Sequence, residues 1–311
     1  MNLIEVKNVK KQYDERVVVD GLSFEVKKGE VFGLLGPNGA GKTTTISMMS
    51  AQLDVSGGTI LVNGIDANKE AFRVKSMVGV VPQDISLYSV LSANDNLKFF
   101  GAIYGLKRKE LKQKVDWILD LVGLKDRAKD PIKNYSGGMK RRINIAAALL
   151  HDPDVVFMDE PTVGIDPQSR NRIYELIQHL KEQGMTIVYT THYMEEATLL
   201  CDRIAIVDNG RVIEYGTTEE LIAKVHGGIL ELTLQAEAAT AAIEAVQGLS
   251  HVVSAQGSNN KLSIVVDDAQ EAIGTIVQHL KQCSIQVTGM HMKPPTLETL
   301  FLHLTGKELR D

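Results

Sequence analysis

The sequence predicts an α/β core followed by a smaller α+β domain. Residues 31–35 are an almost wholly apolar run, typical of a strand that is buried on both faces of a sheet. A glycine-rich segment follows this run, and a helical pattern occupies residues 43–52. A second apolar run lies at residues 155–158, and the pattern changes after Gly227-Gly228. Strand, loop and helix in this order are typical of α/β proteins.

Composition limits both the size of the chain and its partners. With 311 residues, of which 44% are hydrophobic and 23% charged, the chain is too long for one compact core. One large and one small domain are therefore expected. A formal net charge of −5 supplies no overall basic field, so nucleic acid is not expected as a partner.

Three features indicate where the protein works. Cys201 and Cys283 lie far apart without metal-ligand spacing, which favours a reducing compartment such as the cytoplasm over a disulfide scaffold. The first residues become charged too early for a secretory signal. No apolar run approaches the roughly 18 to 20 residues that span a bilayer. We therefore expect that, if the protein acts at a membrane, it does so without crossing it.

The N-terminal segment predicts short strands. Residues 3–6, 16–19 and 22–26 alternate in polarity as half-buried strands do. A turn at Lys28-Gly29-Glu30 then precedes the buried strand at residues 31–35. The fold is therefore expected to open with β structure and to continue as strand, glycine loop and helix.

The glycine loop has the pattern G-x-x-x-x-G-K-T of the phosphate-binding loop. Its glycines permit backbone angles that turn successive N–H groups inward, and the positive end of the following helix strengthens their attraction for β- and γ-phosphates. Lys42 adds a point charge, and the Thr43 hydroxyl is expected to bind magnesium. The expected nucleotide contacts are Gly36, Pro37, Asn38, Gly39, Ala40, Gly41, Lys42, Thr43 and Thr44.

Kinases, GTPases and transport ATPases can all carry such a loop, so further motifs must choose among them. Residues 155–161 predict a second buried strand that ends in paired carboxylates. After a phosphate loop, this arrangement suits Asp159 to hold magnesium and Glu160 to address the attacking water.

The run YSGGM, which contains Ser136, Gly137 and Gly138, is a second glycine-rich start to a helix and implies a second anion site. One nucleotide does not need two such helix ends from a single chain. On these motifs the chain resembles the nucleotide-binding subunit of an ABC transporter, whose signature loop closes on ATP held by a partner subunit. Tyr135 and Met139 depart from the Leu and Gln of the commonest family pattern, which implies tuning of function and not its loss.

The resemblance covers roughly residues 1–225 and adds four positions in the family's order. Tyr13 lies where an aromatic ring stacks on adenine. Gln83 matches the loop residue that touches magnesium and senses the membrane partner. Asp166 matches the loop that crosses between subunits, and His192 matches the switch histidine that contacts the γ-phosphate.

The resemblance also implies a fold and a mechanism. The fold is the ABC ATPase core of the P-loop NTPases, a RecA-like lobe with an N-terminal antiparallel β subdomain and a helical subdomain inserted at about residues 87–150. ATP and Mg²⁺ would be bound, and Glu160 would deprotonate the attacking water. Lys42, the loop amides, His192 and Mg²⁺ would hold the γ-phosphate, with the ion bound by Thr43, Asp159 and Gln83. Two head-to-tail copies would trap two ATP molecules, so that ATP closes a homodimer and hydrolysis releases it.

Separate integral membrane transporter subunits are the partners that the resemblance implies, with this chain peripheral on the cytoplasmic face of the cell membrane. In the family the helical subdomain faces those subunits, and here it is expected to contain helices at residues 93–100 and 115–122 with Gly123 as a stop. A basic run at residues 107–109, with Lys112 and Lys114, is interpreted as a solvated face without a site.

A second domain is predicted at residues 227–311, after a first domain at residues 1–226. Its elements alternate as strand, helix, strand, strand, helix and strand, which suggests a small ferredoxin-like domain. Thr296 is expected to cap a closing helix that resembles the C-terminal appendage in the drug, ion and lipid-linked exporter branch (ABC-2 type). The domain's role in dimer stabilisation, packing or regulatory ligand binding stays open, and its scattered histidines indicate no metal. The predicted elements lie at residues 229–234, 236–246, 252–255, 262–266, 270–280, 285–290 and 294–302.

The leading interpretation is the ATPase subunit of a membrane exporter. A soluble relative that acts in translation or DNA repair is one alternative, although such proteins carry two ATPase heads in one chain or a long coiled coil before the signature, which this sequence does not show. A nucleotide-regulated binding module without turnover would need a defective catalytic set, and no position of that set is missing. An importer motor remains an alternative, and the transported substrate is not specified.

Overall fold

The computed structural model describes residues 1–225 and 227–305. These residues form two compact units, the first of which is Met1–Tyr215 and the second of which begins at Gly216. The division falls earlier than the predicted boundary between residues 226 and 227, because helix α8 (Thr218–Ile222) contacts helix α11 (Leu297–Thr305) and so belongs with the second unit. Residue 226 lies outside the described residues.

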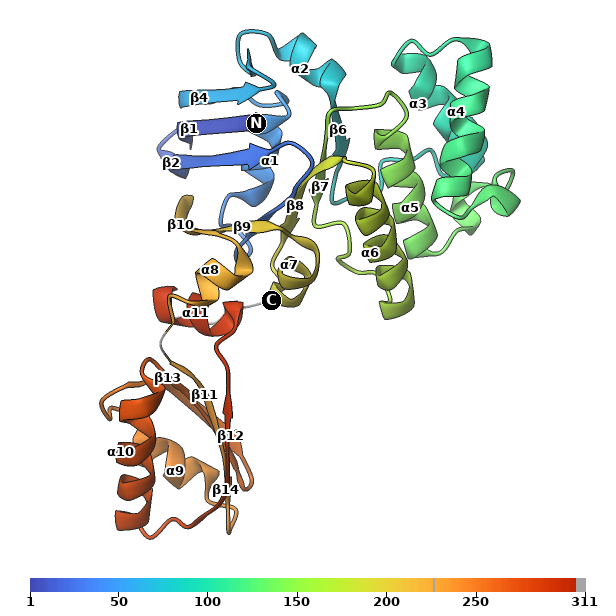
Figure 1. Cartoon of the computed structure of the whole chain (residues 1–311). Helices are drawn as coiled ribbons and strands as arrows, with labels where there is room; N and C mark the ends of the chain where they lie inside the picture. The colour runs from blue at the N-terminus through green and yellow to red at the C-terminus, as the bar shows by residue number, and fades with distance from the viewer. Residues whose placement is uncertain (226, 306–311) are drawn as a thin grey trace. The chain divides into compact units, whose positions relative to one another are not determined.

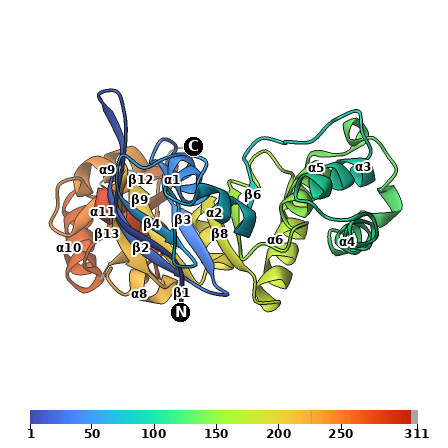
Figure 2. The same ribbon diagram turned by 90° about the horizontal axis from the view of Figure 1, so that it is seen from above.

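An antiparallel sheet opens the first unit, with the strand order β2-β1-β4-β5. Two long strands replace the three short ones predicted, because bulges in the pairing of β1 with β2 bend the ladder without ending it. The hairpin that joins them, dark blue in Figure 2, projects beyond the sheet and has Tyr13 and Arg16 paired next to its turn. The strands are β1 (Asn2–Tyr13), β2 (Arg16–Lys27), β4 (Gly57–Val62) and β5 (Ile65–Asp66).

A six-stranded sheet forms the centre of the first unit, in the order β10-β9-β3-β8-β7-β6. The five strands β9, β3, β8, β7 and β6 are parallel to their neighbours. Strands β3, β7 and β8 are buried at every residue, as the apolar runs predict for β3 and β7, whereas β8 was not predicted. Their carboxyl ends therefore meet at one edge of the sheet. The strands are β3 (Val31–Leu35), β6 (Val78–Val81), β7 (Val155–Asp159), β8 (Thr186–Thr191), β9 (Arg203–Asp208) and β10 (Arg211–Gly216).

Helices surround this sheet, and α3, α4 and α5 pack together as the predicted helical subdomain (Figure 1). Ser92 caps α3 through the N–H of Asp95, and α4 ends before Gly123, whose φ of 64° only glycine adopts easily. The helices are α1 (Lys42–Met49), α2 (Ala71–Met77), α3 (Ala93–Ile103), α4 (Arg108–Leu121), α5 (Gly137–Ala148), α6 (Pro167–Glu182) and α7 (Met194–Leu200), with short 3-10 turns at Lys125–Arg127 and Ile132–Asn134.

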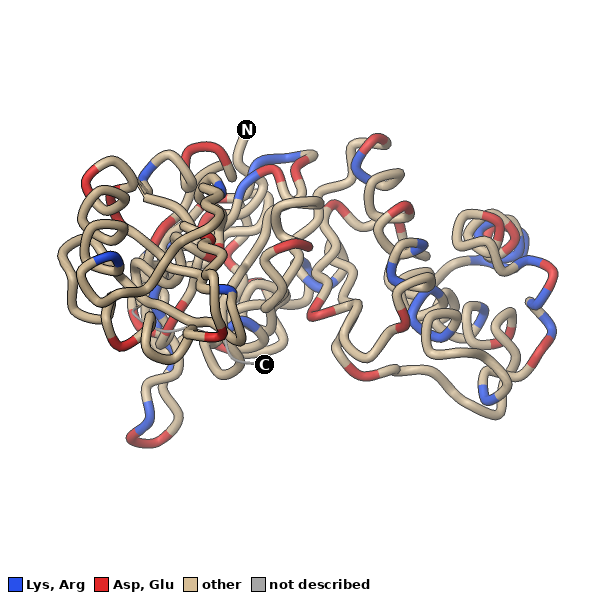
Figure 3. Tube along the Cα trace, turned by 90° about the horizontal axis from the view of Figure 1, so that it is seen from below, with Lys and Arg blue, Asp and Glu red and all other residues tan. Residues whose placement is uncertain are grey.

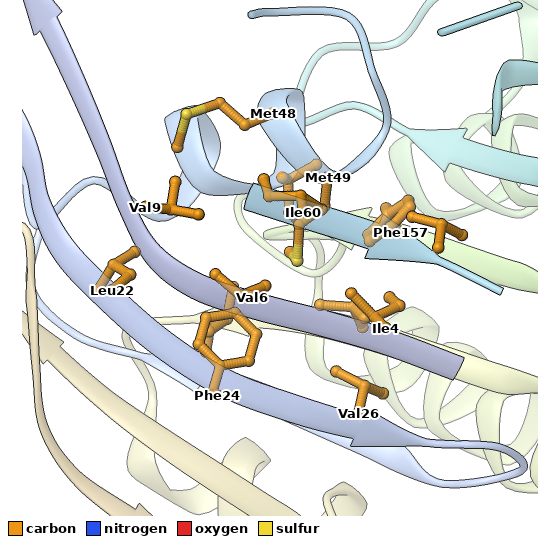
Figure 4. Packing of buried hydrophobic residues seen from close by; sticks show 14 of the residues in the cluster. Ile4, Val6, Val9, Leu22, Phe24, Val26, Met48, Met49, Ile60 and Phe157 are labelled. Atoms are coloured by element: carbon orange, nitrogen blue, oxygen red, sulfur yellow. The ribbon is translucent and has the colours of Figure 1, made fainter. Parts of the chain in front are cut away.

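The main core lies between the antiparallel sheet and α1 (Figure 4). Met48 and Met49 of α1 are fully buried against side chains of β1 and β4, and Phe157 extends the cluster to the central sheet. This packing fixes the helix that follows the phosphate loop, so the loop is held at both ends by buried apolar contacts.

The second unit contains a four-stranded antiparallel sheet in the order β12-β13-β11-β14, with α9 and α10 buried against one face. The predicted order of elements is confirmed, and Thr296 caps α11 by accepting a hydrogen bond from the Thr299 N–H at 3.3 Å. The elements are β11 (Gly228–Leu234), α9 (Ala239–Val246), β12 (Val252–Ser258), β13 (Lys261–Val266), α10 (Ala269–Gln282) and β14 (Val287–Lys293).

The distribution of charge and the hydropathy of the described helices agree with what the composition predicts. Lys and Arg positions are interspersed with Asp and Glu positions along the trace in Figure 3. Lys114, in the basic run of α4, lies 4.4 Å from the centre of the Trp117 ring and pairs with Asp152. Among the helices that the structure describes, none has the length and apolar character that crossing a membrane requires.

Candidate nucleotide site

The phosphate loop joins β3 to α1 in a geometry that requires its glycines. Gly39 and Gly41 have φ angles of 83° and 98°, which side chains of L-residues rarely tolerate. At Gly36 an added Cβ would overlap the carbonyl oxygen of Val207 in the neighbouring strand. The loop can therefore turn its backbone amides toward a ligand at the start of α1, where the helix carries its positive end.

Lys42 is buried in this loop, with 5% of its side chain exposed. Its Nζ donates to the carbonyl oxygens of Gly36 at 2.8 Å and Pro37 at 3.0 Å, and lies 3.0 Å from Glu160 Oε1. The positive charge of Lys42 is thus held against the loop backbone, within reach of the carboxylate at the end of β7.

The Asp159 carboxylate and the Glu160 backbone N–H, at the end of β7, both bond to Thr190 of β8, a residue that the sequence analysis missed. The Thr190 hydroxyl donates to Asp159 Oδ1 at 2.6 Å and accepts from the Glu160 N–H at 2.9 Å. Glu160 has a φ of 44°, a left-handed conformation that costs energy for a residue other than glycine. The bond from Thr190 helps to hold this strained residue, so the direction of the Glu160 side chain depends on the neighbouring strand. The sequence shows a hydroxyl residue at this position, but not that it bonds to Asp159 and Glu160.

His192 follows β8 and approaches the same carboxylate. Its Nδ1 lies 3.3 Å from Glu160 Oε1, but it is aligned too poorly for a hydrogen bond and has no hydrogen-bond partner among the described residues. Only 8% of the His192 side chain is exposed. A buried ring nitrogen in this position is available to a polar group that binds beside Glu160.

One pocket of about 360 Å³ is lined by half of the predicted site residues. It extends from the tip of the β1–β2 hairpin to the phosphate loop and to the ends of β6 and β7. Asp159 and His192 do not line it, but Asp159 bonds to Thr190, and His192 Nδ1 lies 3.3 Å from Glu160 Oε1. Tyr13 contributes a ring that is 46% exposed, which leaves a face for stacking. The lining residues are Tyr13, Arg16, Val18, Asn38, Gly39, Gly41, Lys42, Thr43, Thr44, Gln83 and Glu160.

The signature residues do not line this pocket. Ser136 caps α5 through the Met139 N–H, and a Cβ added at Gly138 would overlap the Ser169 side chain of α6. Asp166 caps α6 in the same way through the Ser169 N–H at 2.9 Å. The structure therefore brings Ser136, Gly138 and Asp166 together at the neighbouring starts of α5 and α6 (Figure 1), separate from the phosphate-loop pocket.

Arg141 of α5 ties the signature helix to the Gln83 loop. Its guanidinium donates to the carbonyl oxygens of Pro82, at 2.6 Å, and of Gln83. Burial lowers the pKa of Arg141, which is 3% exposed. The sequence analysis missed this contact, because nothing in the sequence sets Arg141 apart from the neighbouring Lys140 and Arg142.

Tyr135, a departure from the commonest family pattern, is accommodated inside the helical subdomain. Its ring is 4% exposed, as a leucine there would be, and its hydroxyl donates to the Arg127 carbonyl oxygen at 2.6 Å. The ring is buried and the hydroxyl has a hydrogen-bond acceptor, so Tyr135 fits this segment. This agrees with the expectation that Tyr135 tunes the function and does not abolish it.

Comparisons with known proteins assign the family. The model of a family described as ABC transporter matches residues 19–163. The linearmycin resistance ATP-binding protein LnrL of Bacillus subtilis is 46% identical over 99% of this chain and 100% of its own length. The chain belongs to the ATP-binding proteins of ABC transporters. The Nod factor export ATP-binding protein I of Ralstonia nicotianae is 38% identical over 99% of this chain and 95% of its own length.

Solved structures agree with this family. The cbiO1 protein of Clostridium perfringens, described as part of the ABC transporter complex cbiONQ, has a TM-score of 0.67 and 30% identity, and the match covers 72% of this chain and 91% of that one. The family establishes the chain as an ABC transporter ATPase with the P-loop fold, which binds ATP. The ABC ATPase core and the role of an ATP-binding subunit of an ABC transporter, both inferred from the sequence, are confirmed.

Proposed function

We propose that this ABC ATPase drives export, with one ATP bound in the Lys42 pocket and closed over by Ser136, Gly137 and Gly138 of a second copy. Four features support the pocket assignment. They are the positive φ angles of Gly39 and Gly41, the buried Lys42 ammonium, the buried Glu160 carboxylate, and the His192 Nδ1, which has no hydrogen-bond partner in the described part of the chain. Tyr13 stacks on the adenine, and Thr44 and the residues from Gly36 to Thr43 surround the phosphates.

In the proposed reaction water attacks the γ-phosphate, and the protein supplies position and charge. Glu160 accepts the proton of the water, and Lys42 stabilises the charge that develops on the phosphate oxygens. His192 binds the γ-phosphate through its buried ring nitrogen. Thr190 keeps Asp159 and Glu160 in fixed directions, because one hydroxyl bonds to both.

The donor set at this site fits Mg²⁺. Asp159 offers a carboxylate, Thr43 a hydroxyl and Gln83 an amide oxygen, which are hard oxygen ligands of the kind that magnesium prefers. We propose that these three residues hold the ion. Bound Mg²⁺ supplies neutralisation of negative charge on the β- and γ-phosphate oxygens.

The observation that carries the dimer is the separation of two half-sites in one chain. Lys42 and Glu160 line the pocket, whereas Ser136, Gly138 and Asp166 lie outside it at the starts of α5 and α6. A head-to-tail homodimer completes both half-sites, because each copy then presents its helix ends to the other's nucleotide. We propose that ATP closes this dimer and that hydrolysis opens it.

Light scattering of Glu160→Gln in saturating Mg-ATP tests the dimer. The variant is expected to form a stable dimer with ATP and to be monomeric without nucleotide, because binding persists when the general base is removed. Wild-type protein with Mg-ADP is the control. A variant that stays monomeric in Mg-ATP contradicts the shared site.

We infer export, and partner subunits in the membrane, from the names of relatives that match nearly the whole chain. One is a drug resistance ATP-binding protein and another a Nod factor export ATP-binding protein. The chain would then be peripheral on the cytoplasmic face, bound to integral membrane subunits. Co-purification with an integral membrane protein from detergent-solubilised membranes tests this partnership, and ATP-dependent loss of substrate from loaded vesicles tests the direction.

We propose a ferredoxin-like classification for the C-terminal domain, with domain limits of 1–226 and 227–311. These limits differ from the two compact units in that α8 (Thr218–Ile222) is assigned to the first domain. Support comes from two features, the order strand, helix, strand, strand, helix, strand and the antiparallel sheet order β12-β13-β11-β14. Expression of residues 227–311 alone tests the limits, since a cooperative thermal transition is expected from a self-contained core.

A further inference from the structure

A buried carboxylate that the proposed mechanism does not use lies behind the catalytic residues. Glu196, on the inner face of α7, is 2% exposed. Four hydroxyl groups donate to its two oxygens. Those to Oε1 come from Thr162 at 2.6 Å and Tyr174 at 2.8 Å, and those to Oε2 come from Tyr189 and Thr191, both at 2.8 Å.

The donors to Glu196 come from the segments that carry the catalytic side chains. Thr162 lies two residues after Glu160, and Thr191 immediately precedes His192. Along β8, alternate side chains point to opposite faces, so Thr190 bonds to Asp159 while Tyr189 and Thr191 bond to Glu196. Glu196 therefore joins the two catalytic segments from the side away from the pocket.

A carboxylate can remain in this interior because its acceptor positions are filled. Each oxygen of Glu196 accepts two hydroxyl protons, which offsets the cost of removing the group from water. Burial, assisted by the nearby Glu196 charge, raises the pKa of Tyr189 well above its usual value, and burial with the hydrogen bond to Glu196 raises that of Tyr174. Both tyrosines therefore keep their protons and remain donors at any working pH.

The same cluster extends to the loop of Asp166. The Thr162 carbonyl oxygen accepts from the Ile165 N–H at 3.2 Å, which closes the turn that leads to Asp166. Asp166 caps α6, and Tyr174 projects from the same helix to Glu196. Movement of the Asp166 loop or of α6 thus acts on the hydroxyls that surround one carboxylate.

We propose that Glu196 is a positioning residue for ATP hydrolysis, which holds the Glu160 segment, the His192 segment and the Asp166 turn in fixed relation through Thr162, Thr191 and Tyr174. The inference rests on the catalytic roles proposed above for Glu160 and His192. Its physical basis is that small displacements of a general base are costly in rate even when substrate binding is unaffected.

Tyr174→Phe is the sharpest test, because it removes one donor to Glu196 and leaves both catalytic segments unchanged. We expect kcat to fall about tenfold, as for sub-ångström misplacement of a catalytic group, with the Kd for Mg-ATP unchanged within about twofold. Tyr215→Phe is the matched control, since that hydroxyl bonds to the Glu25 carbonyl oxygen at 3.4 Å and does not touch the cluster. Its kcat should match that of the parent.

Glu196→Gln provides the second measurement. It keeps the shape but replaces one acceptor oxygen by a donor, so we expect a larger fall in kcat than in Tyr174→Phe and a further fall in Glu196→Ala. Melting temperatures are recorded for every variant. Retention of kcat by Tyr174→Phe and Glu196→Gln overturns the proposal, and so does a joint loss of kcat and ATP affinity that follows melting temperature.

The two levels of inference fail in different ways. If Glu160→Gln retains full turnover, the proposed role of Glu160 is wrong and Glu196 loses its function with it. If Glu160→Gln abolishes turnover while Glu196→Gln and Tyr174→Phe hydrolyse ATP at the parent rate, only the positioning role of Glu196 is overturned.

Discussion

The phosphate-loop pocket and the signature edge, which comprises Ser136, Gly138 and Asp166 at the starts of α5 and α6, each include a helix that begins with glycines, yet they are built differently. In the pocket, Lys42 and Glu160 are buried opposite charges, so that charge is already in place for a phosphate. At the signature edge, Ser136 caps α5 and Gly138 packs against Ser169 of the same chain, without a buried charge pair. This difference supports the proposal that the first region supplies the groups for chemistry and that the second supplies helix-end amides to a nucleotide held by another copy.

Removal of the Glu160 charge should have the largest effect on ATP turnover, and this effect should be confined to the pocket. Glu160→Gln is expected to lower kcat by about 10² to 10⁴-fold, the range for loss of a general base, with the Kd for Mg-ATP little changed. Steady-state phosphate release and titration with a labelled ATP analogue measure the two quantities. Full turnover in this variant would remove Glu160 from the role of base.

Lys42 should separate binding from chemistry within the pocket. Lys42→Ala is expected to weaken ATP binding by about 10 to 10²-fold, since a hydrogen bond to a charged group contributes roughly 1.5 to 3 kcal/mol. Equilibrium titration with a labelled ATP analogue measures this. Lys69→Ala is a matched control, because Lys69 is an exposed lysine paired with Asp66 away from the pocket. Equal affinity in the two variants contradicts a phosphate contact from Lys42.

At the signature edge, substitution of Gly138 should lower the stability by disturbing the packing of α5 against α6. A methyl group at Gly138 would overlap the Ser169 Cβ and Oγ, so Gly138→Ala is expected to destabilise the first unit by about 1 to 3 kcal/mol. Thermal or urea unfolding measures the loss.

The double variant Gly138→Ala/Ser169→Gly should recover most of this stability, because the overlapping atoms are removed and the Ser169 N–H that Asp166 accepts remains. The single variant Ser169→Gly measures how much glycine at this helix position lowers the free energy of unfolding, which is expected to be about 0.5 to 1 kcal/mol. If the double variant is no more stable than Gly138→Ala, close packing is not what requires glycine at this position.

Local motifs made most of the pocket predictable, whereas contacts between distant segments did not show in the sequence. The phosphate loop could be recognised because its eight positions are contiguous and its mechanics are local. Thr190, Arg141 and Glu196 could not, because each acts on a segment more than twenty residues away that only the folded sheet and helices bring close. Likewise, bulges decide whether residues 16–27 form one strand, β2, or the two that were predicted, and single-sequence alternation does not reveal them.

The smallest expected effect is at the rim of the pocket, where Tyr13 is nearly half exposed. Tyr13→Ala is expected to weaken ATP binding about fivefold, since one aromatic stack on a base contributes roughly 1 kcal/mol. Tyr13→Phe should keep the affinity, because the ring stacks and the hydroxyl has no assigned contact. Titration with both ATP and GTP sharpens the result: stacking on a π-face tolerates either purine, so a loss confined to ATP would mean that Tyr13 recognises the base edge. The pocket would then select its nucleotide at the hairpin tip, in addition to binding phosphate at the loop.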